Sequence, residues 1–354
     1  MGIILERALP SRFLNTRTFS NYMGNELIEA TIRLENKGRT PVAPLVDHFA
    51  GKYCNLDVDD FMKDGDRRLE AILKVNRELG PWDLVFLGET ANFDLLRMGV
   101  PIDMEIGDET HQFIEGDYLD SSLYSDLNKS HPFFWMRRLL SQKHEDFKGL
   151  SGLFKVASVF HELKKQTRAV RRYGYEPAIG FVTAGPFLEY ASMGRGLENF
   201  CYDLFENREQ IKEAGHGYTK FMTLFSTLLA KYIGTPRVFI GLARSSPSFI
   251  SPQDFEELVL PDLETMVNGY VSRDITPIFH CDSNWADRLD YFRRFPEKKC
   301  ILELDGTTDI RKAKEILGDR MAIMGDVPAR ILAFGSYGDT YNYCRDLIKD
   351  VGDG

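Results

Sequence analysis

Ten polar residues stand directly after short apolar runs of the chain, where side chains of a parallel sheet become free to do chemistry. They are Asp47, His48, Glu89, Thr183, Arg244, His280, Asp282, Glu303, Asp305 and Asp326. Carboxylates dominate this set. An acidic site of this kind favours a bound cation, or carboxyl groups that hold protons at raised pKa values, over a polyanionic substrate.

The sharpest local feature is the run from His280 to Asn284, which reads His-Cys-Asp-Ser-Asn. A His and an Asp two positions apart at a strand end project to the same side and can both reach one ion, whereas Cys281 points the other way. Glu303 follows at the end of the next run and can supply a third ligand. We therefore expect His280, Asp282 and Glu303 to bind a metal ion. The alternative is a His280–Asp282 hydrogen bond that merely closes a loop.

Other residues of the set have two interpretations each. Arg244 either holds a substrate carboxylate through two hydrogen bonds or neutralises the surrounding acids. Asp47 either orients His48 for catalysis or forms an ordinary loop contact with it. We assign His48, Arg244 and Thr183 to substrate binding, together with Tyr190, whose helical spacing is equally typical of a core residue.

Cys281 is a weaker candidate for a catalytic nucleophile, because the sequence identifies no second base to activate it.

The runs that precede these residues have the length and composition of strands buried on both faces. They cover residues 42–46, 84–87, 178–182, 238–242, 275–279, 300–302 and 321–324. Helical segments alternate with them, at residues 197–214, 252–272, 286–295, 310–317 and 340–349. Strands alternating with helices form βαβ units, whose parallel strands end at one edge of the sheet.

The alternation predicts an α/β fold, a (β/α)8 TIM-type barrel that forms one domain over residues 1–354. Helical spacing of residues such as Phe19, Met23 and Ile28 predicts an N-terminal helical segment within residues 1–38. Residues 98–172 are too long for one crossover, and we expect a helical insertion or lid there, with a plain surface excursion as the alternative. The seven predicted strands are one fewer than a closed barrel requires. The eighth strand is therefore either present but not recognised in the sequence, or absent from this chain.

Composition narrows the class of protein. The net charge is −9 with an isoelectric point near 5.4, which argues against nucleic acid and anionic membranes as partners. No apolar stretch has the length of a membrane span or a signal sequence. Five cysteines without disulfide-like spacing favour a reducing compartment, so we expect a soluble, cytoplasmic protein.

Several motifs resemble the uroporphyrinogen decarboxylase superfamily, which also contains corrinoid-linked methyltransferases. They are Gly180-Phe181 with Gly185-Pro186-Phe187, Ser251-Pro252-Gln253-Asp254-Phe255 with Pro261, Phe279-His280-Cys281-Asp282, and Leu317-Gly318 through Met324-Gly325-Asp326-Val327. The resemblance extends from about Asn36 to the end of the chain. It is specific for the superfamily but not for one reaction.

The resemblance implies zinc and a corrinoid carried by a partner protein, as in the zinc-dependent methyltransferase branch. That branch binds the metal through a His-x-Cys pair and a later Cys, sometimes with a Glu between them. Here His280 matches the His, Asp282 occupies the position of the first Cys, and Glu303 falls where the Glu is found. A carboxylate in place of a thiolate makes the site harder and weakens the case for zinc. The chain ends at Gly354, before the expected position of the later Cys.

We therefore expect a metal-dependent methyltransferase that moves a methyl group between a small methylated substrate and a corrinoid protein. Glu89 or Asp326 would donate a proton to the departing oxygen, with Asp47 as a further catalytic group. The second candidate is uroporphyrinogen decarboxylation, although this chain lacks the arginine-rich motif of that branch after its first strand. A further alternative is a degenerate barrel that binds a small molecule without catalysis. The protein could also form a homodimer.

Overall fold

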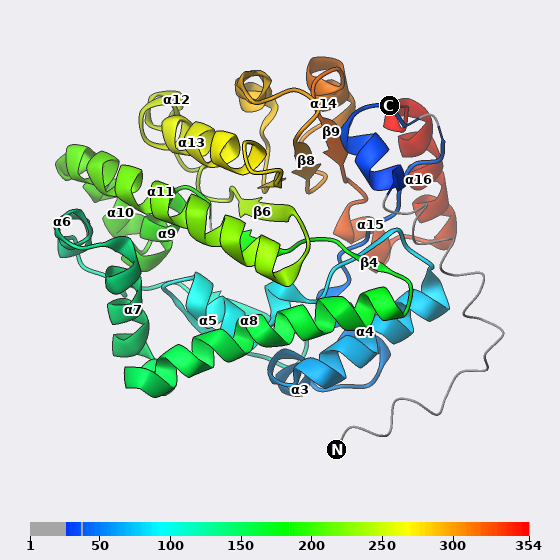
Figure 1. Ribbon diagram of the computed structural model, residues 1–354. Coiled ribbons are helices and arrows are strands. Elements are labelled where there is room, and N and C mark those ends of the chain that lie inside the picture. Colours follow the sequence, from blue (N-terminus) through cyan, green and yellow to red (C-terminus); the bar gives the residue numbers. More distant parts are fainter. Residues whose placement is uncertain (1–25, 37, 184, 354) are drawn as a thin grey trace.

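The computed structural model describes residues 26–36, 38–183 and 185–353, and shows a mixed α/β fold in which helices dominate (Figure 1). The strands are β1 (Leu84–Val85), β2 (Asp103–Ile106), β3 (His111–Ile114), β4 (Glu176–Pro177), β5 (Phe181–Thr183), β6 (Arg237–Gly241), β7 (Thr276–Cys281), β8 (Ile301–Leu304) and β9 (Ala322–Met324). Residues 26–32 are helical. The predicted N-terminal helical segment is thus present in part, and Phe19 and Met23 lie outside the described residues.

The remaining helices connect and cover the strands. The α-helices are α2 (Asp47–Tyr53), α3 (Val58–Lys63), α4 (Gly65–Leu79), α5 (Phe93–Gly99), α6 (Ser122–Lys129), α7 (Pro132–Lys143), α8 (Gly149–Arg172), α9 (Phe187–Arg195), α10 (Leu197–Glu206), α11 (Arg208–Ile233), α12 (Pro252–Asp254), α13 (Leu260–Val271), α14 (Ile310–Leu317), α15 (Ala329–Phe334) and α16 (Tyr337–Val351). Short 3-10 turns are η2 (Glu89–Ala91), η3 (Glu145–Phe147) and η5 (Ala286–Arg294), and a π-helical turn, η4 (Phe255–Val259), precedes α13. No helix among the described residues is long and apolar enough to cross a membrane.

Strands β5 to β9 form one parallel sheet in chain order, and β1 pairs in parallel with β4. The two sheets share one continuous stretch, residues 176–183, whose first part pairs with β1 and whose second part pairs with β6. The backbone N–H of Ala178 donates to Val85 and that of Gly180 donates to Arg237. Parallel pairing thus runs from β1 through residues 176–183 to β6, β7, β8 and β9, but these hydrogen bonds do not close a ring within the described residues.

Arg237 holds the point where residues 176–183 change partner. Its side chain is 1% exposed, and it donates to the carbonyl oxygens of Ala178 and Pro177, each at 2.7 Å, and to Glu176 Oε1 at 3.1 Å. These carbonyl groups would otherwise be buried without a donor at the junction, which is costly. The guanidinium thereby aligns β6 with the strand before it.

Alternate residues of the central strands are buried on opposite faces. Phe239, Ile278 and Ile301 belong to a small inner cluster that also contains Ile28 and Ile32 of the first helix. Val238, Phe279 and Leu302 face the larger core beneath the helices. Burial on both faces explains why these strands read as continuous apolar runs.

One predicted strand is wrong and one predicted insertion is only partly helical. Residues 42–46 form no strand: Val42 and Leu45 are 47% and 44% exposed, and Pro44 has no N–H for a ladder. The stretch 98–172 contains α6, α7 and α8 but begins with an antiparallel hairpin of β2 and β3, which the sequence analysis missed.

Gly180, between β4 and β5, allows this stretch of chain to lie close to the residues that precede β6. A Cβ at this position would lie 2.1 Å from the carbonyl oxygen of Thr235. We expect Gly180→Ala to lower the free energy of unfolding by about 1–3 kcal/mol, because the backbone must shift. Gly217→Ala is the control, since Gly217 is an exposed position of α11 with no atom within 4 Å of a new Cβ, and should stabilise by about 0.5–1 kcal/mol. Urea unfolding of both variants tests this, and equal effects would contradict the packing argument.

Candidate functional site

The carboxyl ends of β6 to β9 bring the predicted site residues to one edge of the sheet. The register places His280 beside Gly241 on one side and Glu303 on the other, and Glu303 beside Met324. His280 and Glu303 have the same parity as Ile278 and Ile301, so both side chains lie on the inner face. Cys281 is fully buried on the outer face, away from them.

His280 is hydrogen bonded on both sides of its ring. Nδ1 contacts Glu303 Oε2, Nε2 lies 3.2 Å from Asp282 Oδ1, and the ring packs 4.8 Å from that of Phe239. Burial alone lowers the pKa of His280, but the hydrogen bonds to Asp282 and Glu303 and their charges outweigh it and raise the pKa to about 10. His280 is therefore an imidazolium held between two carboxylates at neutral pH.

This geometry does not fit a three-ligand metal site. Glu303 contacts Nδ1 of His280 and Asp282 contacts Nε2, so the two carboxylates lie on opposite sides of the ring. A metal ion bound to either nitrogen would therefore be next to one carboxylate and away from the other. Within the described residues, no group of three or more His, Cys, Asp or Glu side chains is placed to hold a metal ion. Zinc stays a prediction that this arrangement does not support.

Glu189 is a buried acid at this edge that the sequence analysis did not select. Its carboxylate accepts from the backbone N–H groups of Arg244 and Ser245, at 2.8 and 2.7 Å. Burial raises its pKa to about 7, although these hydrogen bonds oppose the shift, and the charge of Asp282 raises it further. The sequence analysis considered only residues that follow strands, and it missed Glu189 because this residue lies inside helix α9.

Arg244 is already paired. Its guanidinium donates to Glu115 Oε2 at 2.8 Å and lies over the ring of Phe249, 5.2 Å from the centroid. Glu115 directly follows β3, so the hairpin supplies this partner. Of the two interpretations of Arg244, the structure favours neutralisation of an acid.

A second cluster of acids surrounds Glu89 and Asp47. Thr90 donates a hydrogen bond to Asp47, the N–H of Leu87 donates to Glu89 Oε2 at 2.7 Å, and Arg68 lies close enough to lower both pKa values by its charge. Burial nevertheless raises the pKa of Asp47 and raises that of Glu89 to about 8. Glu89 is therefore mainly protonated at neutral pH. Asp47 stands in the first turn of α2 and does not follow a strand.

His48 pairs with a histidine that sequence reasoning missed. Its Nε2 lies 2.9 Å from Nδ1 of His111 on β3, and its own Nδ1 is buried without a partner in the described structure. Burial and the neighbouring His111 lower the pKa of His48 to about 4, and burial lowers that of His111. Both rings are neutral at pH 7. Recognition of the hairpin would have been needed to find His111.

The remaining predicted residues make no hydrogen bond or ion pair with His280 within the described chain. Thr183 Oγ1 accepts from the N–H of Gly185 at 3.3 Å, a local loop contact. Asp326 accepts from the hydroxyl of Tyr343 at 2.6 Å, and burial raises its pKa. Tyr190 is buried against the rings of Trp135 and Tyr218 and lines an apolar cavity among helices.

The amino-acid sequence is similar to that of known proteins. The uroporphyrinogen decarboxylase (URO-D) family model matches residues 140–354. The uroporphyrinogen decarboxylase of Geobacter metallireducens is 29% identical over 83 residues, which are 23% of this chain and 24% of the relative. The chloroplastic enzyme of Nicotiana tabacum is 29% identical over 188 residues, 50% of this chain and 45% of the relative. The matches thus span less than half the length of these curated relatives.

A solved structure shares the fold over most of its length. A methyltransferase from Methanosarcina mazei superimposes with a TM-score of 0.64 at 14% sequence identity, covering 86% of this chain and 82% of that one. At this identity the likeness shows the fold alone.

Loss of the His280 imidazolium should destabilise the protein in a pH-dependent way. We expect His280→Ala to lower the free energy of unfolding by about 1.5–3 kcal/mol near pH 6. Because the folded pKa is raised to about 10 from 6.5, this stabilisation is fully present below pH 6.5 and is lost as pH rises through 10. Urea unfolding across this range measures it, with His216→Ala at an exposed position of α11 as control. A deficit that does not shrink at alkaline pH would refute the ion-pair interpretation.

Proposed function

This chain belongs to the uroporphyrinogen decarboxylase (URO-D) family, and on that premise we propose that it transfers a methyl group between a small methylated compound and a corrinoid on a partner protein. We further propose that its strands belong to a (β/α)8 barrel whose catalytic end is the edge that carries His280. A cytoplasmic location is consistent with the free thiols of all five cysteines.

The charge at the strand exits is the observation that carries this proposal. Glu89, Asp282, Glu303 and Asp326 stand at or shortly after strand ends, whereas Arg244, which follows β6, is engaged by Glu115. Arg68 is 2% exposed and donates to backbone carbonyl groups, so it is not available to a substrate. Such a site suits a neutral or cationic small molecule and repels one that carries many carboxylates.

Protonated Glu89 supplies the acid that demethylation of an ether requires. When the bond between the methyl carbon and oxygen breaks, its electron pair stays on oxygen, and a proton from Glu89 neutralises the alkoxide as it forms. The corrinoid provides the nucleophile that accepts the methyl group. Because the three predicted zinc ligands do not fit one ion, no step here depends on a metal.

Uroporphyrinogen decarboxylation is the second candidate, and the curated relatives favour it by name. Its substrate carries several carboxylates and would need several free cations. The pairing of Arg244 with Glu115 weighs against it.

A donor panel distinguishes the two activities. We expect cob(I)alamin to become methylated when the protein is supplied with a suitable methyl ether or methylamine, as followed by its absorbance spectrum. Uroporphyrinogen in a parallel assay should remain unconverted. Formation of coproporphyrinogen would reverse this ranking, and failure of every methyl donor would favour a binding protein without catalysis.

Glu89→Gln tests the proton donor. Glutamine has the shape of the protonated acid but cannot give up a proton, so the fold should persist while methyl transfer from an ether slows by about 100- to 10,000-fold. The unmodified protein should lose activity as pH rises above about 8, because Glu89 must be protonated to act. The control is Asp262→Asn, which removes another buried acid with a pKa raised to about 7 from helix α13. Equal losses in both variants would exclude a specific role for Glu89.

A further inference from the structure

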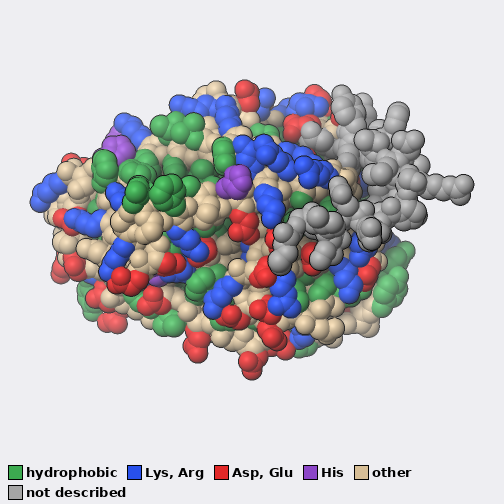
Figure 2. Space-filling model, turned by 60° about the horizontal axis from the view of Figure 1, so that its bottom comes forward, with side chains coloured by type: hydrophobic (Ala, Val, Ile, Leu, Met, Phe, Trp, Pro, Cys, Tyr) green, Lys and Arg blue, Asp and Glu red, His purple; other side chains and the backbone are tan. Residues whose placement is uncertain are grey.

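Apolar side chains collect on the outside of the helical insertion, around the ends of α7 and α8. Phe134, Leu150 and Phe154 are 62%, 68% and 67% exposed. Figure 2, which turns this side of the molecule forward, shows hydrophobic side chains gathered toward its left. Their neighbours Phe133 and Leu153 line a cavity.

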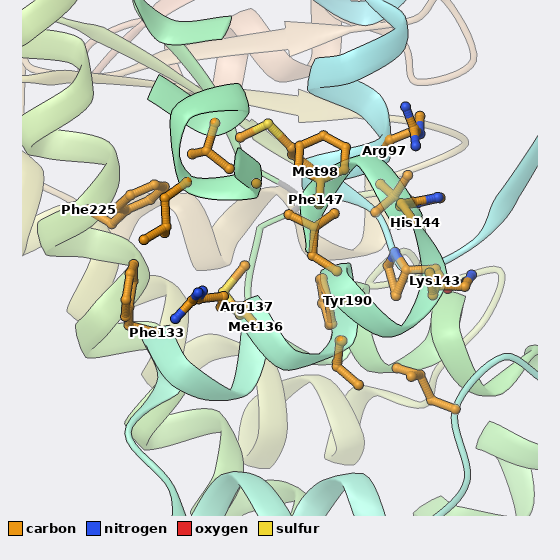
Figure 3. A pocket seen from close by; sticks show the side chains of 18 of the residues that line it. Arg97, Met98, Phe133, Met136, Arg137, Lys143, His144, Phe147, Tyr190 and Phe225 are labelled. Carbon is orange, nitrogen blue, oxygen red and sulfur yellow. Dashed lines mark hydrogen bonds between the residues drawn. The ribbon is translucent and has the colours of Figure 1, made fainter. Parts of the chain in front are cut away.

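The cavity lies among α5, α7, α8 and α11, with Tyr190 of α9 in its wall, and has a volume of about 110 Å³ (Figure 3). It is comparable with an engineered 150 Å³ cavity in another protein that binds benzene. Its wall includes Met98, Met136 and Phe225. This size and lining suit one aromatic ring or a hydrocarbon of similar bulk.

Aromatic side chains give the lining a preference for a flat ring. Phe221 stacks on Phe225 with centroids 5.5 Å apart, Phe133 lies 6.5 Å from Phe221, and Tyr190 lies 5.8 Å from Trp135. A further ring can extend this set by edge or offset contacts, and two methionine sulfurs add favourable contacts with it.

The polar groups of the wall are basic, but they differ in availability. Arg97 is bound by Asp94 and Asp146. Lys143 donates to the carbonyl oxygen of Pro101 and lies 3.5 Å from Asp103. Burial and neighbouring cations lower the pKa of His144, so it is neutral at pH 7.

Arg137 differs from these three. It donates to the carbonyl oxygen of Gly149 at 3.2 Å, and none of the ion pairs in the described chain includes it. Figure 3 shows it beside Met136 and Phe133, across the cavity from Lys143 and His144. It can therefore meet a carboxylate whose hydrocarbon body occupies the cavity.

We propose that this cavity is a binding site for a small aromatic carboxylate, with the ring among Met98, Met136 and Phe225 and the carboxylate on Arg137. The site lies away from His280, and of the predicted site residues its wall contains Tyr190 alone. Helix α9, which carries Tyr190, follows β5 closely, so an occupant contacts an element that leaves the same edge of the sheet. The proposal does not depend on which reaction that edge catalyses.

Benzoate and toluene are matched probes, because they share a ring and differ mainly in charge. Calorimetric or NMR titration of the full chain should give a dissociation constant for benzoate of about 1 mM or tighter. Arg137→Gln should weaken benzoate binding at least tenfold while changing toluene binding less than twofold. Met136→Phe, which fills part of the cavity, should weaken both probes, with thermal melting to check that the variant is folded.

Phe134→Ala is the control, since Phe134 is exposed and does not line the cavity. It should leave both affinities within twofold of the unmodified protein. Failure of benzoate to bind, or equal weakening of benzoate and toluene by Arg137→Gln, would overturn the proposal. So would loss of benzoate binding in Phe134→Ala together with full binding in Met136→Phe, because that result would place the probe on the outer apolar surface.

Discussion

The buried guanidinium of Arg237 sets the alignment on which the rest of the structure depends. It bonds Glu176 and the carbonyl groups of Pro177 and Ala178 at the junction where one strand changes its partner from β1 to β6. Burial of a cation costs several kcal/mol unless hydrogen bonds satisfy it, and here they do. Strand β6 then pairs with β7, and the pairing of β7 with β8 places His280 beside Glu303.

Several carboxyl groups stand near the ends of the strands, and they are stabilised in three different ways. Glu303 and Asp282 share the imidazolium of His280, whereas Glu189 accepts two backbone N–H groups. Glu89 instead keeps its proton, because burial raises its pKa to about 8. These means leave groups of different chemical character: a protonated acid at Glu89, a buried acid bound by two N–H groups at Glu189, and a fixed cation at His280.

Much of the fold could be predicted because doubly buried strands leave a clear apolar pattern. The runs at 238–242, 275–279 and 321–324 correspond to β6, β7 and β9, and the superfamily inferred from the motifs around them is confirmed. The pattern failed at 42–46, where apolar residues are half exposed around Pro44. It also failed at the hairpin, in whose strands no residue is buried, so that the apolar pattern of a buried strand is missing.

The site was harder to predict than the fold, because spacing shows which residues are near one another but not which atoms face which. The interval between His280 and Glu303 correctly places both on adjacent strands. It does not show that Glu303 meets Nδ1 while Asp282 meets Nε2, which separates the expected ligands. His111 and Glu115 could not be found at all without the hairpin that carries them.

That hairpin ties together two distant parts of the chain. His111 at its second strand contacts His48, and Glu115 just beyond it pairs with Arg244 after β6. A displacement of β2 and β3 would break both contacts at once, giving an unpaired guanidinium and two freed imidazole rings. The surroundings of His48 and of Arg244, which belong to different parts of the chain, therefore both depend on one hairpin of two four-residue strands.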